Sequence, residues 1–513
     1  MNDSAQDAPS TAERRPRRRA AAPVADTPAR QSRYRHLVNP FEPLKVFSDD
    51  QVAAIHASAL TMLENQGMRV LLPEARETYR RGGGQVDEST LTVRLDRGLV
   101  EQCLALAPRE IVLRAARPEF DMPVWGKHVM FAPTSGPPNI MDTTRGKRAG
   151  SFEDFCNIIK ICQSFEVMHG LGGLVEPQDI PVQFRHLETT RAMLLMSDKI
   201  PKVYARGPGQ TVDNFEMIRI AYGLTEEEFR SRPCVTTIIN TNSPLQLDIP
   251  MANGIMDYAA AGQVLIITPF TLAGAMAPVT IAGALAQQNA EALAGIAFTQ
   301  MVRPGAPVVY GGFTSNVDMK TGAPAFGTPE YMKAVLLGGQ LCRKYGLPYR
   351  TSNVNAANTV DAQAAYESVF SLWALTQGGG NFIMHSAGWL EGGLVASFEK
   401  FILDCDLIQM VSEFMQPLET TEDALGVEAI REVGPGGHFF GAQHTLARYT
   451  NAFYAPIISD WRNNQQWLAA GKPEAWQKAN AVWKQALADY QQPFIEPAIR
   501  EELNAFVEKR KAE

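Results

Sequence analysis

The sequence has few cysteines, and none of them is arranged as a metal-binding or redox pair. Its six cysteines are scattered along 513 residues, and no CxxC motif occurs. This pattern is typical of reduced thiols and argues against a disulfide framework. Cys156 and Cys162 lie six positions apart in a predicted helix. Buried free thiols are the favoured interpretation of this spacing, although a metal pair is conceivable. We therefore expect a cytoplasmic protein that supplies no metal site.

Long apolar runs and a basic charge balance are also absent. No apolar run reaches the roughly 18 residues that span a bilayer, so we expect no membrane helix. The formal net charge of −7 argues against nucleic-acid binding, which needs a clustered basic face. Residues 1–38 differ, because they are rich in arginine and nearly free of large apolar residues. They predict a disordered basic arm, although such a tail can also attract anionic partners.

A GxGxxG fingerprint is missing after the first predicted strand, so the mark of a dinucleotide-binding sheet is absent. Instead, short apolar runs alternate with helical patterns over 151–513, which indicates parallel βαβ units. This pattern suits an α/β fold, a TIM (β/α)8 barrel whose eighth strand is too weak to locate, with a doubly wound sheet as the alternative. The predicted strands are Val167–Leu174, Lys202–Ala205, Cys234–Asn240, Gln263–Thr268, Pro307–Gly312, Pro348–Ser352 and Asn381–His385.

Residues 39–150 predict a smaller α+β region ahead of the barrel. Ser48, two acidic residues and apolar positions at helical spacing predict a helix over 48–67. Short strand-like pieces follow at 91–93 and 110–113. From about residue 397 we expect a helical extension that packs on the outside of the barrel. The other predicted helices are Phe184–Met196, Met251–Ala261, Gly283–Val302, Pro329–Lys344, Ala362–Gln377, Phe398–Met415 and Trp476–Gln491.

The residues that follow the predicted strands are the first candidates for a site, because barrel active sites lie at the carboxyl ends of the strands. The set is rich in aromatic and amide side chains. It contains no paired carboxylates, no Ser-His-Asp arrangement and no HExxH or CxxC spacing. The candidates are Glu176, Arg206, Asn240, Asn242, Pro269, Phe270, Tyr310, Phe313, Thr351, Asn353 and His385.

Four aromatic residues suggest a site for a cation that has no hydrogen to donate. Aromatic faces attract a quaternary ammonium group by about 0.5–2 kcal/mol per contact. Glu176 or Glu391 could add negative charge. The alternative is that the aromatic residues belong to the core beneath the rim of the barrel. The four aromatic residues are Phe270, Tyr310, Phe313 and Trp389.

Two of the eight histidines, His438 and His444, lie six positions apart in a glycine-rich segment. The glycines predict a loop, so the two side chains do not share a helix face. Binding of a substrate carboxylate, or contact with a cofactor, is one hypothesis. The other is that both histidines are hydrogen-bonded to loop carbonyls. A metal site would need further ligands that the sequence does not reveal.

Several motifs in this order are similar to those of the trimethylamine methyltransferase family, over nearly the whole chain from about residue 40. They are Ser243-Pro244-Leu245, the segment 271–280, Gly327-Thr328-Pro329-Glu330, the segment 387–394 and the segment 434–446. The resemblance implies a TIM barrel that docks a separate corrinoid protein. It also implies transfer of a methyl group from an amine to Co(I) of cobalamin, which the partner supplies and this chain does not bind tightly. Homo-oligomers are expected in this family.

Archaeal trimethylamine enzymes of the family carry pyrrolysine at a position that falls at or near Asn358 here, and no special residue is present. A quaternary amine already carries a positive charge and leaves as a neutral amine, so it needs no activation. The resemblance therefore implies a quaternary-amine methyltransferase, with glycine betaine as the leading substrate and proline betaine, carnitine or butyrobetaine as rivals. Asn355 and Asn358 would line the catalytic pocket, and Arg206, His438 or His444 would bind the carboxylate.

Two other classes of protein remain as hypotheses. A lyase or aldolase-like barrel would need a lysine at the end of a strand. Lys202, however, begins a predicted strand, and Lys320 lies in a predicted loop. A non-catalytic protein that binds quaternary amines would have the same aromatic residues. Only a requirement for the corrinoid protein separates that hypothesis from the enzyme.

Overall fold

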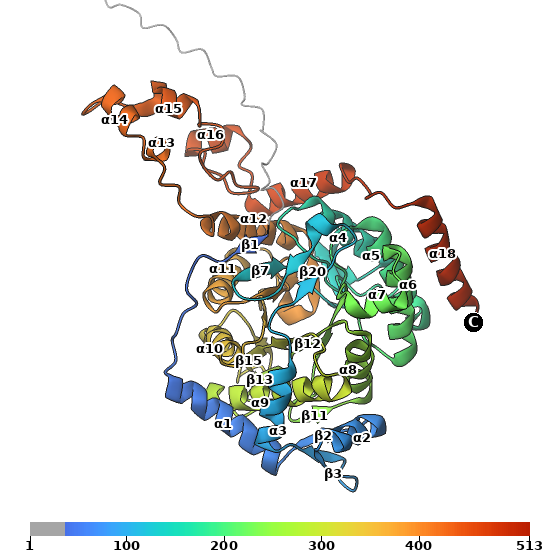
Figure 1. Cartoon of the computed structure of the whole chain (residues 1–513). Helices are drawn as coiled ribbons and strands as arrows, with labels where there is room; N and C mark the ends of the chain where they lie inside the picture. The colour runs from blue at the N-terminus through green and yellow to red at the C-terminus, as the bar shows by residue number, and fades with distance from the viewer. Residues whose placement is uncertain (1–35) are drawn as a thin grey trace, which may run out of the picture.

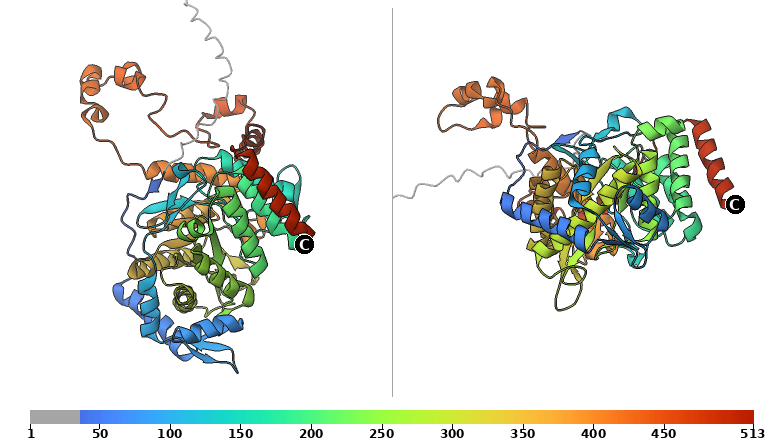
Figure 2. Two further views of the ribbon diagram at one scale, coloured as in Figure 1. Left: turned by 45° about the vertical axis from the view of Figure 1, so that its right-hand side comes forward. Right: turned by 60° about the horizontal axis from the view of Figure 1, so that its bottom comes forward.

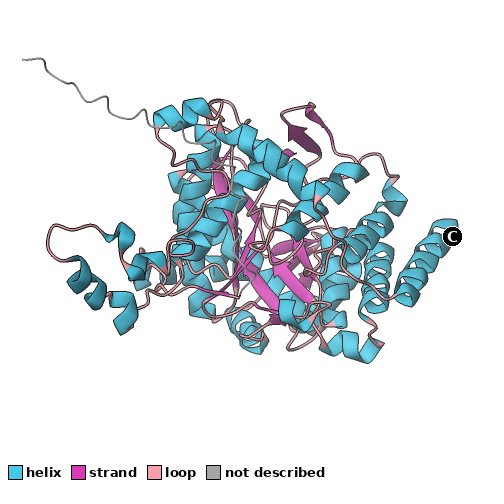
Figure 3. Ribbon diagram, turned by 90° about the horizontal axis from the view of Figure 1, so that it is seen from above, coloured by secondary structure: helices cyan, strands magenta, loops and turns pink. Residues whose placement is uncertain are grey.

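The computed structural model describes residues 36–513, so most of the expected basic N-terminal segment, residues 1–38, lies outside the described residues. Leu37–Val38, which we assigned to that N-terminal segment, instead form strand β1, which pairs antiparallel with β7. The fold is mixed α/β, with strands at the centre and helices around them (Figure 3). None of the described helices combines the length and apolar character that crossing a bilayer requires.

The main sheet contains six parallel strands and the short antiparallel β1 at one edge. Its order is β1-β7-β18-β17-β14-β12-β10. Five of the seven predicted strands are confirmed as members of this sheet, and the apolar sequences of β12, β14 and β18 are typical of parallel strands buried on both faces. The bounds are β7 His128–Phe131, β10 Thr236–Ile239, β12 Val264–Ile267, β14 Val308–Gly311, β17 Tyr349–Ser352 and β18 Phe382–Met384.

The two other predicted strands form single bridges between the edges of the main sheet. Next to β7, the N–H of His169 donates to the carbonyl of Phe131 at 2.9 Å. Gly170 then bridges Ile200, and Lys202 bridges Thr236 of β10, both in parallel orientation. Strand β7 itself lies before residue 150, so the main sheet extends across the boundary that we expected between the N-terminal region and the barrel.

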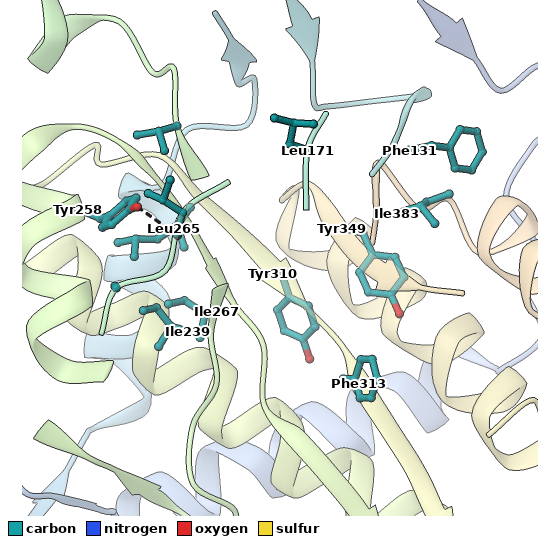
Figure 4. Packing of buried hydrophobic residues seen from close by; sticks show 14 of the residues in the cluster. Phe131, Leu171, Ile239, Tyr258, Leu265, Ile267, Tyr310, Phe313, Tyr349 and Ile383 are labelled. Atoms are coloured by element: carbon teal, nitrogen blue, oxygen red, sulfur yellow. Dashed lines mark hydrogen bonds between the residues drawn. The ribbon is translucent and has the colours of Figure 1, made fainter. Parts of the chain in front are cut away.

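Alternation along the strands divides the buried side chains into two clusters. In β12, Val264 and Ile266 join one cluster, whereas Leu265 and Ile267 join the larger one, because successive side chains of a strand point to opposite faces. The smaller cluster also contains apolar side chains of β5 (Val112–Leu113) and β6 (Met122–Pro123). The larger cluster packs against helices and includes Tyr310 and Tyr349 (Figure 4).

Most of the predicted helices are confirmed, with small shifts of their ends. α9 is buried over nearly its whole length because α1 and α3 pack against it. A capping box formed by Ser48 and Gln51 starts α1, as the sequence predicts. The bounds are α1 Asp49–Asn65, α3 Arg97–Leu106, α4 Phe152–Ser164, α5 Val182–Met196, α6 Pro208–Tyr222, α8 Ile249–Ala261, α9 Ile281–Val302, α10 Pro329–Tyr345 and α11 Ala362–Gln377.

A second, four-stranded sheet and a short helix complete the N-terminal part, which forms the foot of the molecule in Figure 1. Its order is β11-β2-β4-β3, so a strand from residue 246 onward joins three N-terminal ones. The bounds are β2 Met68–Val70, α2 Pro73–Arg81, β3 Gln85–Asp87, β4 Thr92–Arg94 and β11 Gln246–Leu247.

The C-terminal part begins with α12 (Phe398–Phe414) and only partly packs on the body. Residues 416–453, which we call the arm, stand away from the body (Figures 1 and 2) and carry the short helices α13, α14 and α15. The chain returns to α12 at Tyr454, whose hydroxyl donates to Asp406 Oδ1 at 2.5 Å. The remaining bounds are α13 Glu422–Leu425, α14 Val427–Val433, α15 Gln443–Leu446, α16 Asn464–Ala469, α17 Ala475–Ala488 and α18 Pro497–Ala512.

Candidate functional site

A cavity of about 600 Å³ lies at the carboxyl ends of the parallel strands. Six of the residues that follow predicted strands line it, together with Trp389. The expectation that the site lies at the carboxyl ends of the strands, which we call the strand-end rule, therefore selected residues of this cavity. The lining residues are Ser135, Gly136, Lys202, Tyr204, Ala205, Arg206, Ile238, Asn240, Thr241, Asn242, Ser243, Met251, Phe270, Met276, Phe313, Arg350, His385 and Trp389.

Three aromatic residues and one histidine form the apolar part of the cavity. The rings of Phe270 and Phe313 have centroids 5.2 Å apart, and Phe313 lies 6.2 Å from Trp389. The imidazole of His385 lies 4.0 Å from the indole of Trp389 and meets Phe313 edge-on at 5.8 Å. These spacings are those of mutually packed aromatic side chains. We call Phe270, Phe313, His385 and Trp389 the aromatic cluster.

Small sheets beyond the main strands position this cluster. Phe270 begins β13 (Phe270–Ala273) and Phe313 begins β15 (Phe313–Val317); these strands are parallel, and the two residues are register partners. Trp389 begins β19 (Trp389–Leu390), which pairs with β20 (Val395–Ser397). His385 directly follows β18 and has a φ of 54°, a left-handed conformation that is uncommon outside glycine. Such strained positions cluster at functional sites.

Two buried cations lie in the same cavity. Lys202 Nζ donates to Ser135 Oγ at 2.6 Å and lies 4.1 Å from the centroid of the Tyr204 ring. Burial, followed by repulsion from Arg350 and Arg206, lowers the Lys202 pKa well below its ordinary value. Burial lowers the Arg350 pKa to about 10.

His385 shares this electrostatic environment. Its pKa lies well below the ordinary value because of burial and then because Arg350 and Lys202 repel a further positive charge. Nδ1 of the ring lies 3.1 Å from Ser352 Oγ. A neutral imidazole therefore lies beside the indole of Trp389, and it can accept or donate one hydrogen bond.

Arg206 and Glu176 lie together at the rim of the cavity. Both guanidinium Nη groups of Arg206 donate to the two carboxylate oxygens of Glu176, at 2.6 and 2.9 Å. Arg185 also donates to Glu176, at 2.7 Å. Burial alone would raise the pKa of Glu176, but these two arginines lower it. Because Glu176 is already paired with two arginines, it does not provide the negative charge for a cation that we expected of it.

Four other predicted site residues lie outside the cavity. Tyr310 points towards α9, where its hydroxyl donates to Asn289 Oδ1 at 3.0 Å; it shares the strand face of Val308, which packs against helices. Asn355 is buried and donates to the carbonyl of Ala364 at 3.0 Å. Asn358 and Glu391 do not line the cavity either. Asn358 is exposed, and Glu391 is paired with Lys147.

The two histidines of the glycine-rich segment lie in the arm. His438 is exposed, and His444 Nε2 lies 3.0 Å from the carbonyl oxygen of Asp423. Neither residue lines the cavity. The partner of His444 is thus a backbone carbonyl within helix α13, and a role of either histidine in carboxylate binding stays a prediction.

Lys202, Tyr204 and Arg350 are the residues that the sequence analysis missed. The alternation of Lys202, Tyr204 and Arg206 was an available signal, because alternate residues of a strand share one face. Lys202 was discounted as the start of a strand, yet its side chain lines the cavity. Arg350 lies within β17 instead of after it, so the strand-end rule did not select it.

A parallel α/β sheet with an aromatic cavity at the carboxyl ends of its strands defines a small-molecule-binding protein of enzyme-like architecture. A family model described as trimethylamine methyltransferase (MTTB) matches residues 12–513. The chain belongs to this family.

Characterised relatives point to related chemistry. The glycine betaine methyltransferase of Desulfitobacterium hafniense (strain Y51) is 37% identical over 467 residues, which cover 91% of this chain and 97% of that protein. The trimethylamine methyltransferase MttB of Methanosarcina barkeri is 29% identical over 475 residues, with 91% and 95% covered. Among solved structures, the monomethylamine methyltransferase MtmB of Methanosarcina barkeri matches with a TM-score of 0.46 and 12% identity, covering 87% of this chain and 95% of that one.

Proposed function

We propose that this protein transfers a methyl group from a quaternary amine, with glycine betaine as the leading substrate, to Co(I) of a corrinoid carried by a partner protein. The observation that carries the proposal is the aromatic cluster, which lines a cavity at the carboxyl ends of the strands. Aromatic faces attract quaternary ammonium, and this group needs no hydrogen-bond acceptor. The similarity to a glycine betaine methyltransferase supports this choice.

In this reaction the protein binds and orients the methyl donor. The corrinoid supplies the electron pair that forms the new bond to the methyl carbon. The carbon–nitrogen bond breaks, its electron pair stays on nitrogen, and a neutral tertiary amine leaves without needing a proton. Phe313 and Trp389 would hold the ammonium group so that one methyl group faces the mouth of the cavity. Such positioning is the main contribution that a protein makes when the cofactor carries the chemistry.

The proposal includes a (β/α)8 barrel. The single bridges at Gly170 and Lys202 lie between β7 and β10, the two strands that would have to meet for the ring to close. With these two segments the ring would contain eight parallel strands. The barrel domain would then begin near β7, and the N-terminal region would end before it instead of at residue 150. The scattered free cysteines support a cytoplasmic location.

The test is to mix the pure protein with Co(I) cobalamin, and then with a corrinoid protein, and to follow loss of the Co(I) absorbance. The methyl donors are glycine betaine, proline betaine, carnitine, butyrobetaine and trimethylamine. Betaine-dependent loss of Co(I), with trimethylamine inert, is expected. Absence of turnover with every donor, in a protein that still binds glycine betaine, would favour the alternative of a non-catalytic binding protein.

We also propose a homo-oligomer in which the arm of one copy docks on another copy. α11 and α12 form an exposed apolar groove of about 530 Å³, and the arm starts directly after α12. The arm itself exposes many apolar side chains although it stands away from the body (Figure 2). Exposed apolar patches of this kind mark interfaces. The groove residues are Tyr366, Val369, Phe370, Leu372, Trp373, Leu407, Met410, Val411 and Phe414, and the exposed apolar arm residues are Leu418, Leu425, Val427, Ile430, Phe439, Phe440, Leu446, Tyr449 and Phe453.

A second copy is the favoured occupant because one chain then provides both apolar surfaces, and a two-fold pair covers both at once. Light scattering coupled to gel filtration should show a dimer or a larger multiple. Trp373→Arg in the groove and Phe440→Asp in the arm should each yield monomers. Met319→Asp, at an exposed residue outside both surfaces, is the control. A monomeric wild-type protein, or arm variants that remain oligomeric, would refute this arrangement.

A further inference from the structure

The charge of the cavity does not suit a simple cation. Three of its lining residues are basic, and no acidic residue is among the described residues that line it. Arg206 is neutralised by Glu176 at the rim, but Lys202 and Arg350 have no carboxylate within ion-pairing distance in the described part of the chain. A bare cation that entered the aromatic cluster would meet two like charges at close range.

Arg350 is the more unusual of the two residues. Its side chain is 1% exposed, and Nε and Nη1 have no hydrogen-bond partner among the described residues. Its guanidinium carbon lies 5.4 Å from the centroid of the Phe313 ring. A buried charge without partners is costly, and buried polar groups without partners are rare. An anionic ligand in the cavity would remove this cost.

Lys202 provides a second positive group in the same cavity. The side chain is 1% exposed and, among the described residues, donates only to the hydroxyl of Ser135. Lys202, Arg350 and His385 all line this cavity, and both cations lower the pKa of His385. A carboxylate placed there would accept hydrogen bonds from both.

We propose that Lys202 and Arg350 form a carboxylate subsite beside the aromatic cluster, so that the substrate is a zwitterion that carries a quaternary ammonium and a carboxylate. This inference rests on the proposed function and assigns the residues that would bind the carboxylate of its substrate. The two subsites are adjacent, because Phe313 contacts both the guanidinium of Arg350 and the rings of Phe270 and Trp389. Adjacent subsites favour a short linker between the two charged groups of the substrate.

This arrangement also gives the site its selectivity. The carboxylate of a zwitterion would pair with Lys202 and Arg350, whereas choline or tetramethylammonium has no carboxylate and would add a third positive charge. Rejection of a ligand that leaves buried polar groups unpaired is a strong form of discrimination. Neutralising the carboxylate should therefore weaken binding even when the ammonium group and the overall size are retained.

The first experiment uses the wild-type full-length protein and calorimetric binding, which needs no turnover. The probes are glycine betaine, its methyl ester, choline and tetramethylammonium. We expect glycine betaine to bind and the other three to bind at least about tenfold more weakly, the loss expected when hydrogen bonds to a charged group are removed. Equal binding of glycine betaine and its methyl ester would overturn the carboxylate subsite.

The second experiment uses Lys202→Met and Arg350→Gln, with Lys320→Met as a control that removes an exposed positive charge outside the cavity. Each cavity variant should weaken glycine betaine binding by about tenfold or more while the control does not change it.

Arg350 is buried, so its variant is first compared with the wild type by circular dichroism and thermal unfolding. If Arg350→Gln does not fold, the ligand panel on the wild-type protein still decides the question. Carboxylate-dependent binding without methyl transfer would refute the proposed function and leave the subsite standing. Methyl transfer from choline as fast as from glycine betaine would support methyl transfer and refute the subsite.

Discussion

The backbone N–H of Gly388 donates a 2.9 Å hydrogen bond to Asp404 Oδ2, which joins α12 to the loop that precedes Trp389. The same carboxylate accepts a hydrogen bond from Ser368 Oγ at 2.9 Å and is paired with Lys400. The side chains of Lys400 and Asp404 are both fully buried. His385 and Trp389 flank this anchor, so a polar network behind the cavity fixes one side of the aromatic cluster.

Asp404→Ala should therefore destabilise the protein strongly. It would leave Lys400 buried without its counter-ion, and breaking such a pair costs about 3–5 kcal/mol. Chemical denaturation measures the free energy of unfolding. The double variant Lys400→Met/Asp404→Leu, which removes both charges, should recover much of the loss. Asp49→Ala, which breaks the exposed Lys45–Asp49 pair, is the control and should cost about 0–1 kcal/mol. An equal effect of Asp404→Ala and Asp49→Ala would contradict this role.

Trp389→Leu should weaken glycine betaine binding without unfolding the protein. Loss of one cation–π contact of about 0.5–2 kcal/mol corresponds to a rise in Kd of about two- to thirtyfold. Tyr310→Phe is the matched control, because Tyr310 points towards α9 and not into the cavity. That variant should lose about 1 kcal/mol of stability with its hydrogen bond to Asn289 and leave Kd unchanged. The opposite pattern, with Kd sensitive to Tyr310 and not to Trp389, would rule out the assigned cluster.

Asp257 on α8 should make stability depend on pH. Burial raises the pKa of its carboxyl group to about 6, and Oδ2 has no hydrogen-bond partner among the described residues. Between the unfolded value near 4 and the folded value near 6, the folded state holds the proton more tightly, so stability falls as pH rises through this window. Above this pH window the carboxyl group is ionised in both states, and the free energy of unfolding is lowered by the full cost of burying the charge.

Asp257→Asn should therefore stabilise the protein by about 1–3 kcal/mol at pH 8 and by much less at pH 4. Denaturant unfolding at several pH values measures the difference. Asp50→Asn, which changes an exposed carboxylate on α1, should show no such pH-dependent gain. A gain for Asp257→Asn that is the same at both pH values would exclude titration of Asp257 as its cause.

Much of the fold follows from local patterns. The helix after Ser48 has a complete capping signal, and the strand now called β12 is a continuous apolar run, so both could be located from the sequence. β7 could not, because its four residues carry only a short apolar pattern and its place beside β18 depends on contacts made over 250 residues later in the chain. The same long-range contacts are the reason why the sequence set the domain boundary at residue 150, whereas we propose that the barrel begins near β7.

The site was only partly predictable, because strand-end position does not specify where a side chain points. It selected Phe270, Phe313 and His385, which line the cavity, and their role in binding stays a prediction. It failed for Tyr310, where the pleat directs the ring to the helix side. It also failed for Arg350, which reaches the cavity from within its strand. The glycines around His438 predicted a loop, but they could not show that the loop belongs to an arm outside the body.

Glu291 should control the order of the loop that follows β10. Its carboxylate, on α9 and fully buried, accepts hydrogen bonds from the hydroxyls of Thr241 and Ser243 at 2.5 and 2.8 Å and from the N–H of Leu245 at 2.9 Å. Glu291→Ala removes the carboxylate that accepts these three hydrogen bonds and should cost about 1.5–3 kcal/mol or more. Because Thr241 and Ser243 line the cavity, glycine betaine binding should weaken as well.

Hydrogen exchange of the backbone amides in 241–247 reports this effect directly, because an amide exchanges faster once its hydrogen bond opens locally. Glu291→Ala should speed exchange at Leu245 while the amides of β12, in the adjacent strand, stay protected. Glu502→Ala, at an exposed position on α18, is the control and should change neither exchange nor binding. Unaltered exchange at Leu245 in Glu291→Ala would show that the cis Ser243–Pro244 segment holds its shape without the buried carboxylate.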